Sequence, residues 1–86
     1  MRHVTATDLD RLEPLLAQLR SLGTLRERNP GTFMLKSRAF LHFHADGDEL
    51  FADVRLDDEF ERHRVTTADE RDQLLNAIKR AVERPD

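Results

Sequence analysis

The sequence of 86 residues contains no cysteine, no tryptophan and no tyrosine. The absence of cysteine excludes a disulfide framework, a thiolate metal site and a cysteine nucleophile. No apolar run approaches the length of a membrane span or of a signal peptide, so a soluble, cytoplasmic protein without membrane contact is expected. A chain of this length predicts one domain, residues 1–86, that buries only about 60–65% of its unfolded surface.

An excess of positive charge is also missing. The formal net charge is −3, and the 17 acidic and 14 basic residues are mixed along the chain. Proteins that bind nucleic acid usually carry a clustered basic surplus, so a nucleic acid is not expected as a partner. The sequence also lacks a glycine-rich phosphate loop, and Ser21 and Ser37 have no matching Ser-His-Asp context, so we expect no enzyme.

The most strongly patterned stretch runs from residue 38 to residue 56. Apolar and polar side chains alternate here with a period of two, which indicates half-buried strands, and Asp46-Gly47-Asp48 supplies turn residues between them. We therefore predict a β-hairpin with one covered face. The covered face is predicted to carry Ala39, Leu41, Phe43, Leu50, Ala52, Val54 and Leu56. The uncovered face is predicted to carry Phe40, His42, His44, Phe51, Asp53 and Arg55.

A segment with helical periodicity precedes the hairpin. Thr7 with the acids that follow it indicates a helix start, and leucines at helical spacing continue to Gly23, a natural residue for a helix end. Pro14 removes one backbone hydrogen bond. The helix therefore either bends at this residue or has its main part beginning near Glu13-Pro14.

A second helical segment follows the hairpin. Thr67 and Glu70 form a capping-box pattern, and an apolar stripe continues to about Glu83 before Pro85 ends the helix. Between the elements, residues 24–31 are predicted as a loop, and residues 32–36 and 60–65 as short strands. The segment Lys36-Ser37-Arg38 either turns the chain or continues it through a bulge.

These elements predict an α+β fold. The architecture is a two-layer sandwich in which an N-terminal and a C-terminal helix cover one face of an antiparallel meander of three or four strands. Replacing Phe43 with alanine is predicted to cost about 3–5 kcal/mol, because its ring lies in the core between the layers.

The hairpin sequence resembles a family of small bacterial proteins of unknown function. The likeness is carried by Phe40-Leu41-His42-Phe43-His44 and by the strand from Leu50 to Leu56, and it covers roughly residues 29–65. It implies an α+β fold and brings no catalytic residue. A weaker likeness, in the basic turn Lys36-Ser37-Arg38 followed by a strand with phenylalanine, is to the MmcQ/YjbR-like family, whose members are suspected by fold analogy of binding DNA.

The pair His42 and His44 carries the clearest chemistry. Residues i and i+2 of a strand point to the same side, so two neutral imidazoles about 6–7 Å apart can converge on one metal ion. If the turn is the four residues Asp46–Glu49, Asp53 lies opposite His42 and supplies a third ligand. If the second turn is the three residues 57–59, His63 extends the row, whereas a two-residue Asp46-Gly47 turn would place Phe51 opposite His42.

Three functions remain open from the sequence. The first is a small non-enzymatic binding domain that uses the uncovered face, as a homodimer or with another protein or a small molecule, since exposed Phe40 and Phe51 imply a partner, a ligand pocket or a bend that hides them. A homodimer through the histidines would dissociate between about pH 8 and 5.5. The second is a divalent-metal site on His42, His44 and Asp53. The third is the binding of an anionic ligand or of nucleic acid through Arg38, Arg55, Arg62 and Arg64, which the net charge disfavours. These arginines can also pair with acids across the strands.

Overall fold

The computed structural model describes residues 1–83. This part of the chain contains two helices and six strands, and every strand pair is antiparallel. The helices are α1 (Ala6–Ser21) and α2 (Ala68–Val82). The strands are β1 (Arg2–His3), β2 (Arg26–Asn29), β3 (Thr32–Leu35), β4 (Arg38–Asp46), β5 (Glu49–Val54) and β6 (Glu61–Arg64). The predicted α+β fold is confirmed, with more strands than the three or four expected.

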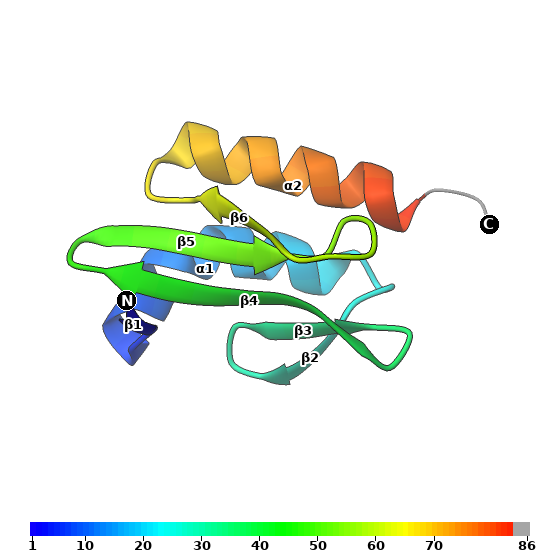
Figure 1. Cartoon of the computed structure of the whole chain (residues 1–86), viewed down its shortest axis with the longest axis horizontal. Coiled ribbons are helices and arrows are strands. Elements are labelled where there is room, and N and C mark those ends of the chain that lie inside the picture. The colour runs from blue at the N-terminus through cyan, green and yellow to red at the C-terminus, as the bar shows by residue number, and fades with distance from the viewer. Residues whose placement is uncertain (84–86) are drawn as a thin grey trace.

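The sheet is a meander in the order β2-β3-β4-β5-β6, and β1 joins it as an extra partner of β4. Figure 1 shows α1 behind β4 and β5, and α2 alongside β6, so the helices form one layer and leave the opposite face of the sheet without a helix. We call that uncovered side the outer face. The core between the layers is built by leucines of both helices and by the inner side chains of the strands. Its fully buried members include Leu12, Leu16, Leu19, Phe33, Leu41, Leu50, Val54, Val65 and Ile78.

Helix α1 begins at Thr5 as its N-cap, two residues before the predicted cap at Thr7. The Thr5 hydroxyl accepts a hydrogen bond from the Asp8 backbone N–H, and the Asp8 carboxylate accepts one from the Thr5 N–H at 2.9 Å. Arg2 of β1 forms an ion pair with the same carboxylate and lowers the pKa of Asp8 to about 2. This extra cation explains why Thr5 is the cap. The helix runs through Pro14 without a break.

The other helix ends agree with the prediction where the structure describes them. Gly23 has φ +77° just after α1, and Thr67 and Glu70 form the expected capping box at the start of α2. The C-cap of α2 is Glu83. The predicted stop at Pro85 lies outside the described residues.

Strand β2 lies in the segment that was predicted as a loop, and that prediction is wrong. Strand β2 lies at the edge of the sheet, where a strand has only one neighbour. The side chain that β2 turns toward α1 is Glu27 rather than an apolar residue, so the sequence lacks the alternation of apolar and polar residues that indicates a strand. Arg20 of α1 donates to Glu27 at 2.7 Å and 3.1 Å, and the Gly31 N–H donates to it at 3.0 Å. An ion pair therefore holds the β2–β3 hairpin to the helix layer.

Phe40 is buried, with 3% of its surface exposed, which corrects its predicted place on the outer face. The register between β3 and β4 shifts at this point: Phe33 pairs with Leu41, but Met34 pairs with Ala39. Phe40 is thus the extra residue of a β-bulge, and the bulge turns its ring inward while Ala39 becomes exposed. Of the two alternatives for residues 36–38, the turn is the one that occurs, because Lys36-Ser37 joins the separate antiparallel strands β3 and β4, and the bulge lies beyond it at Phe40. A bend hides Phe40, so it gives no reason to expect a partner.

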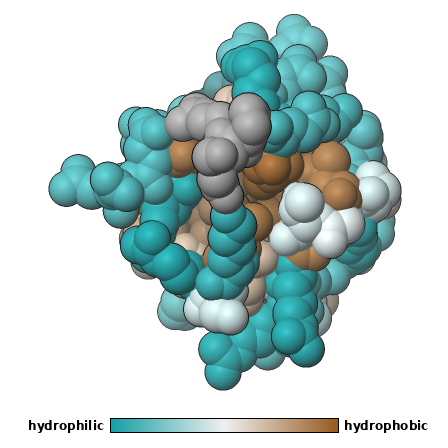
Figure 2. Space-filling view, turned by 90° about the vertical axis from the view of Figure 1, so that its right-hand side faces the viewer, coloured by the Kyte–Doolittle hydropathy of each residue, from teal (hydrophilic) through white to brown (hydrophobic). Residues whose placement is uncertain are grey.

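An apolar hollow lies at the end of the molecule next to this bulge. It is lined by Leu35, Ala39, Phe40, Leu56 and Ala81, together with charged residues at its rim. Figure 2 looks onto this end and shows hydrophobic surface between hydrophilic side chains.

Candidate functional site

His42, His44 and Asp53 meet at the centre of the outer face. His42 and His44 lie two residues apart on β4, and Asp53 lies directly opposite His42 on β5. Asp46 pairs with Glu49, so the hairpin has the four-residue turn from which this pairing was predicted. The hairpin register is therefore confirmed.

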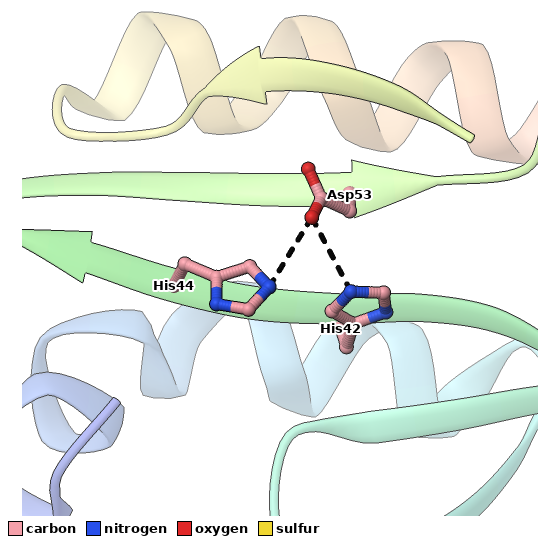
Figure 3. Close-up of side chains that lie close together, drawn as sticks. All are labelled: His42, His44 and Asp53. Atoms are coloured by element: carbon pink, nitrogen blue, oxygen red, sulfur yellow. Dashed lines mark ion pairs between the residues drawn. The ribbon is translucent and has the colours of Figure 1, made fainter. Parts of the chain in front are cut away.

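The two imidazoles converge on one carboxylate oxygen (Figure 3). The Nε2 atom of His42 lies 3.3 Å from Asp53 Oδ2, and the Nε2 atom of His44 lies 3.2 Å from the same oxygen. One ligand atom of each residue lies within 4.8 Å of the others. Metal–ligand bonds of about 2.0–2.1 Å put neighbouring ligands about 3.3–3.4 Å apart in a tetrahedron. The spacing between each histidine and Asp53 matches such an edge.

Arg62 of β6 binds Asp53, and it is one of the arginines that were expected to pair with acids across the strands. Asp53 pairs with Arg62 across β5 and β6, and Ala52 pairs with His63, so the predicted row through His63 is wrong by one residue. A shift of one residue moves a strand side chain to the other face, and His63 accordingly lies on the inner side. Arg62 donates to Asp53 Oδ1 at 2.8 Å through Nε and to Oδ2 at 3.0 Å through Nη2.

The Arg62 hydrogen bond at Asp53 and the burial of His44 favour the protonation states that metal binding requires. The hydrogen bond from Arg62 holds the pKa of Asp53 below its usual range, so this carboxylate is ionised at neutral pH. Burial is the largest influence on His44 and lowers its pKa, although the charge of Asp53 opposes the shift. Neutral imidazoles and an ionised carboxylate are the forms that coordinate metal ions.

The aromatic rings of His3 and Phe60 flank the cluster of His42, His44 and Asp53 on its two sides on the outer face. His3 of β1 is paired with His44, and their ring centroids lie 5.7 Å apart. On the other side Phe60 meets the His42 ring edge at a centroid distance of 5.2 Å, and Arg55 lies 4.5 Å from the centroid of Phe60. Phe60 is 39% exposed. Three of the four histidines of the chain therefore lie on this face.

The structure thus gathers most of the residues that the sequence placed on the uncovered face. His42, His44 and Asp53 form its centre, Phe51 lies half-buried opposite His44, and Arg55 is held by Phe60. Phe40 is absent from the face because of the bulge. Sequence reasoning missed His3 and Phe60. The opposite charges of Asp53 and Arg62 were the signal that could have fixed the second register.

The donor atoms gathered here are suited to holding a metal ion. Two imidazole nitrogens and one carboxylate oxygen suit Zn²⁺ or a similar divalent transition metal, whereas Mg²⁺ and Ca²⁺ prefer an all-oxygen shell. The Ser21 hydroxyl donates to the Gln18 carbonyl at 2.7 Å and lies on α1, away from the histidines. The described residues therefore show no nucleophile activated by a histidine.

The comparisons with other proteins give no independent assignment. Within residues 1–83 neither helix is long and apolar enough to cross a membrane. No family model, no curated protein and no solved structure matches this chain.

Proposed function

We propose that the chain is a small binding domain, and that the centre of its outer face binds a divalent transition-metal ion through His42, His44 and Asp53. The observation that carries the proposal is the spacing of both Nε2 atoms at 3.2–3.3 Å from one carboxylate oxygen. Zn²⁺ is the ion that this donor set favours, because it accepts mixed nitrogen and oxygen ligands in a tetrahedron. The fourth position of the tetrahedron is left for water or for a ligand.

Arg62 donates hydrogen bonds to the carboxylate of Asp53 and therefore competes with a metal ion for that carboxylate. Its side chain is 50% exposed, so the guanidinium can move away from Oδ2 into solvent without leaving the rest of the site exposed. A bound divalent cation would replace the charge that Arg62 now supplies to Asp53. Metal binding at Asp53 Oδ2 therefore requires the exposed Arg62 side chain to change its position.

Titration calorimetry with Zn²⁺ tests the proposal directly. We expect one Zn²⁺ ion per chain and a rise in melting temperature at saturating metal, both lost in His42→Ala and in His44→Ala. His63→Ala is the matched control, because it removes the one histidine that lies on the inner side and should leave binding unchanged. Equal loss of binding in all three variants, or no heat with the unmodified protein, would overturn the metal site.

A homodimer through the outer face is the second candidate function. It is favoured by the exposed ring of Phe60 beside His42 and by the half-buried Phe51, which leave aromatic surface on an open sheet. Sedimentation velocity over a wide range of protein concentration tests it in the presence of a chelator. We expect a dimer that Phe60→Ser dissociates. A monomer at every concentration would remove this candidate and leave the metal site unaffected.

A further inference from the structure

Arginines in this protein fall into two groups. Six of those within residues 1–83 have a partner for the guanidinium: Arg2 binds Asp8, Arg11 donates to the Asp48 carbonyl, Arg20 binds Glu13 and Glu27, Arg62 binds Asp53, Arg64 binds Glu49 and Glu70, and Arg71 donates to the carbonyls of Val65 and Thr66. For the other arginines within residues 1–83, which are Arg26, Arg28, Arg38, Arg55 and Arg80, no hydrogen bond or ion pair of the guanidinium is seen, and Arg26 and Arg28 lie together on β2.

These two arginines line the same hollow. It lies on the β2–β3 hairpin, and its wall is completed by Thr24, Met34, Lys36 and Ser37, with Glu27 at its edge. The carboxylate of Glu27 is already bound by Arg20 and by the Gly31 N–H, so its charge is compensated. The hollow therefore combines two arginines, one lysine and two hydroxyl groups in a protein whose overall charge is −3.

The turn at the rim of the hollow is strained. Lys36 has φ +52° and Ser37 has φ +69°, a two-residue hairpin turn for which Asn-Gly is the usual sequence. Side chains in the left-handed region cost free energy, and such residues collect at functional positions. Here the unfavourable residues place a cation and a hydroxyl group beside Arg26 and Arg28.

We infer that this hollow binds a phosphate-bearing anion. Arginine matches the phosphate group with two parallel hydrogen bonds, and the hydroxyl groups of Thr24 and Ser37 supply further donors. The ion pair between Arg20 and Glu27 ties the strand that carries Arg26 and Arg28 to α1, on the side opposite to the hollow. The site is separate from His42, His44 and Asp53 and does not depend on a bound metal ion.

The test is a titration of ¹⁵N-labelled protein with pyrophosphate, followed by NMR at low salt and in the presence of a chelator. We expect saturable amide shifts at Thr24–Arg28 and Met34–Ser37, with little change at His42 and His44. Arg26→Gln/Arg28→Gln should weaken binding at least tenfold. Lys79→Gln/Arg80→Gln is the matched control, because it removes two positive charges from α2 and leaves the hollow intact.

A parallel titration with a single-stranded oligothymidylate identifies the source of the phosphate. Tighter binding of the oligonucleotide than of pyrophosphate, lost in the same double variant, would assign a nucleic-acid backbone. Equal or weaker binding would assign a small phosphorylated molecule. Shifts spread over the surface, or an equal loss of affinity in both double variants, would overturn the inference. The arginines would then only keep the edge strand β2 from pairing with other chains.

Discussion

The two faces of the β4–β5 hairpin share one backbone and have opposite roles. On the inner face Leu41, Phe43, Ala52 and Val54 are at most 3% exposed and contribute to the core. His42, His44 and Asp53 alternate with these residues along the two strands and therefore lie on the outer face. There they form a polar cluster that is partly open to solvent. Alternation along a strand thus lets neighbouring residues serve stability and binding separately. Substitutions on the two faces should therefore have separable effects.

The largest effect is expected on the inner face. Phe43→Ala removes a ring that is 3% exposed and should lower the free energy of unfolding by about 3–5 kcal/mol, which a domain of this size can hardly tolerate. Urea unfolding followed by circular dichroism measures the change. His42→Ala, the neighbouring substitution on the outer face, serves as the control and should change the unfolding free energy by less than about 1 kcal/mol without metal. Similar losses for both would contradict the division between the faces.

Arg62→Met should move stability and metal affinity in opposite directions. Without metal, Asp53 loses its bidentate partner while it remains largely buried, so we expect a loss of about 1–3 kcal/mol in unfolding free energy. Zn²⁺ affinity should rise, by roughly tenfold, because a competing positive charge is gone. Arg64→Met is the control on the same strand, since its ion pairs with Glu49 and Glu70 are exposed. Unchanged or weaker Zn²⁺ binding in Arg62→Met would count against competition.

Asp8→Ala tests the helix layer alone. The variant loses the N-cap partner of Thr5 and the ion pair with Arg2, and should cost about 1–2 kcal/mol at neutral pH. Because the pKa of Asp8 is lowered to about 2, its stabilisation is complete above the ordinary carboxyl pKa and is lost as the pH falls toward 2. The unfolding curves of the two proteins should therefore converge near that pH. A difference that persists there, or a similar cost for exposed Asp10→Ala, would refute the assignment.

Ser37→Gly is expected to have the smallest effect on the unfolding free energy. The substitution changes both the strained turn and the lining of the hollow that is proposed to bind the anion. Glycine accepts φ +69° without strain, so the unfolding free energy should rise by about 0.5–1 kcal/mol. The lost hydroxyl should weaken pyrophosphate binding at the same time. Thermal melting and the NMR titration measure both changes. A variant less stable than the unmodified protein would show that Ser37 makes a compensating contact.

The sequence by itself determined the periodic parts of the molecule. The capping box at Thr67, the leucine stripes of both helices and the alternation from Leu41 to Val54 each predict an element from contacts within a few residues. The same alternation placed His42, His44 and Asp53 on one face, but it left two hairpin registers open, and the structure has the one with the turn Asp46–Glu49. Local chemistry was sufficient because the period of the apolar residues specifies which side is buried.

Only the tertiary structure decided the remaining features, because each depends on a residue distant in the sequence. Strand β2 pairs with β3 and is tied to α1 by the ion pair between Arg20 and Glu27, and no apolar pattern in the sequence records either contact. The bulge that buries Phe40 follows from the register against Phe33, and the partner of Asp53 follows from the length of the β5–β6 loop. One added residue reverses the face of every side chain beyond it. The sequence therefore supplied the ligands of the outer face, and the fold decided which of them meet.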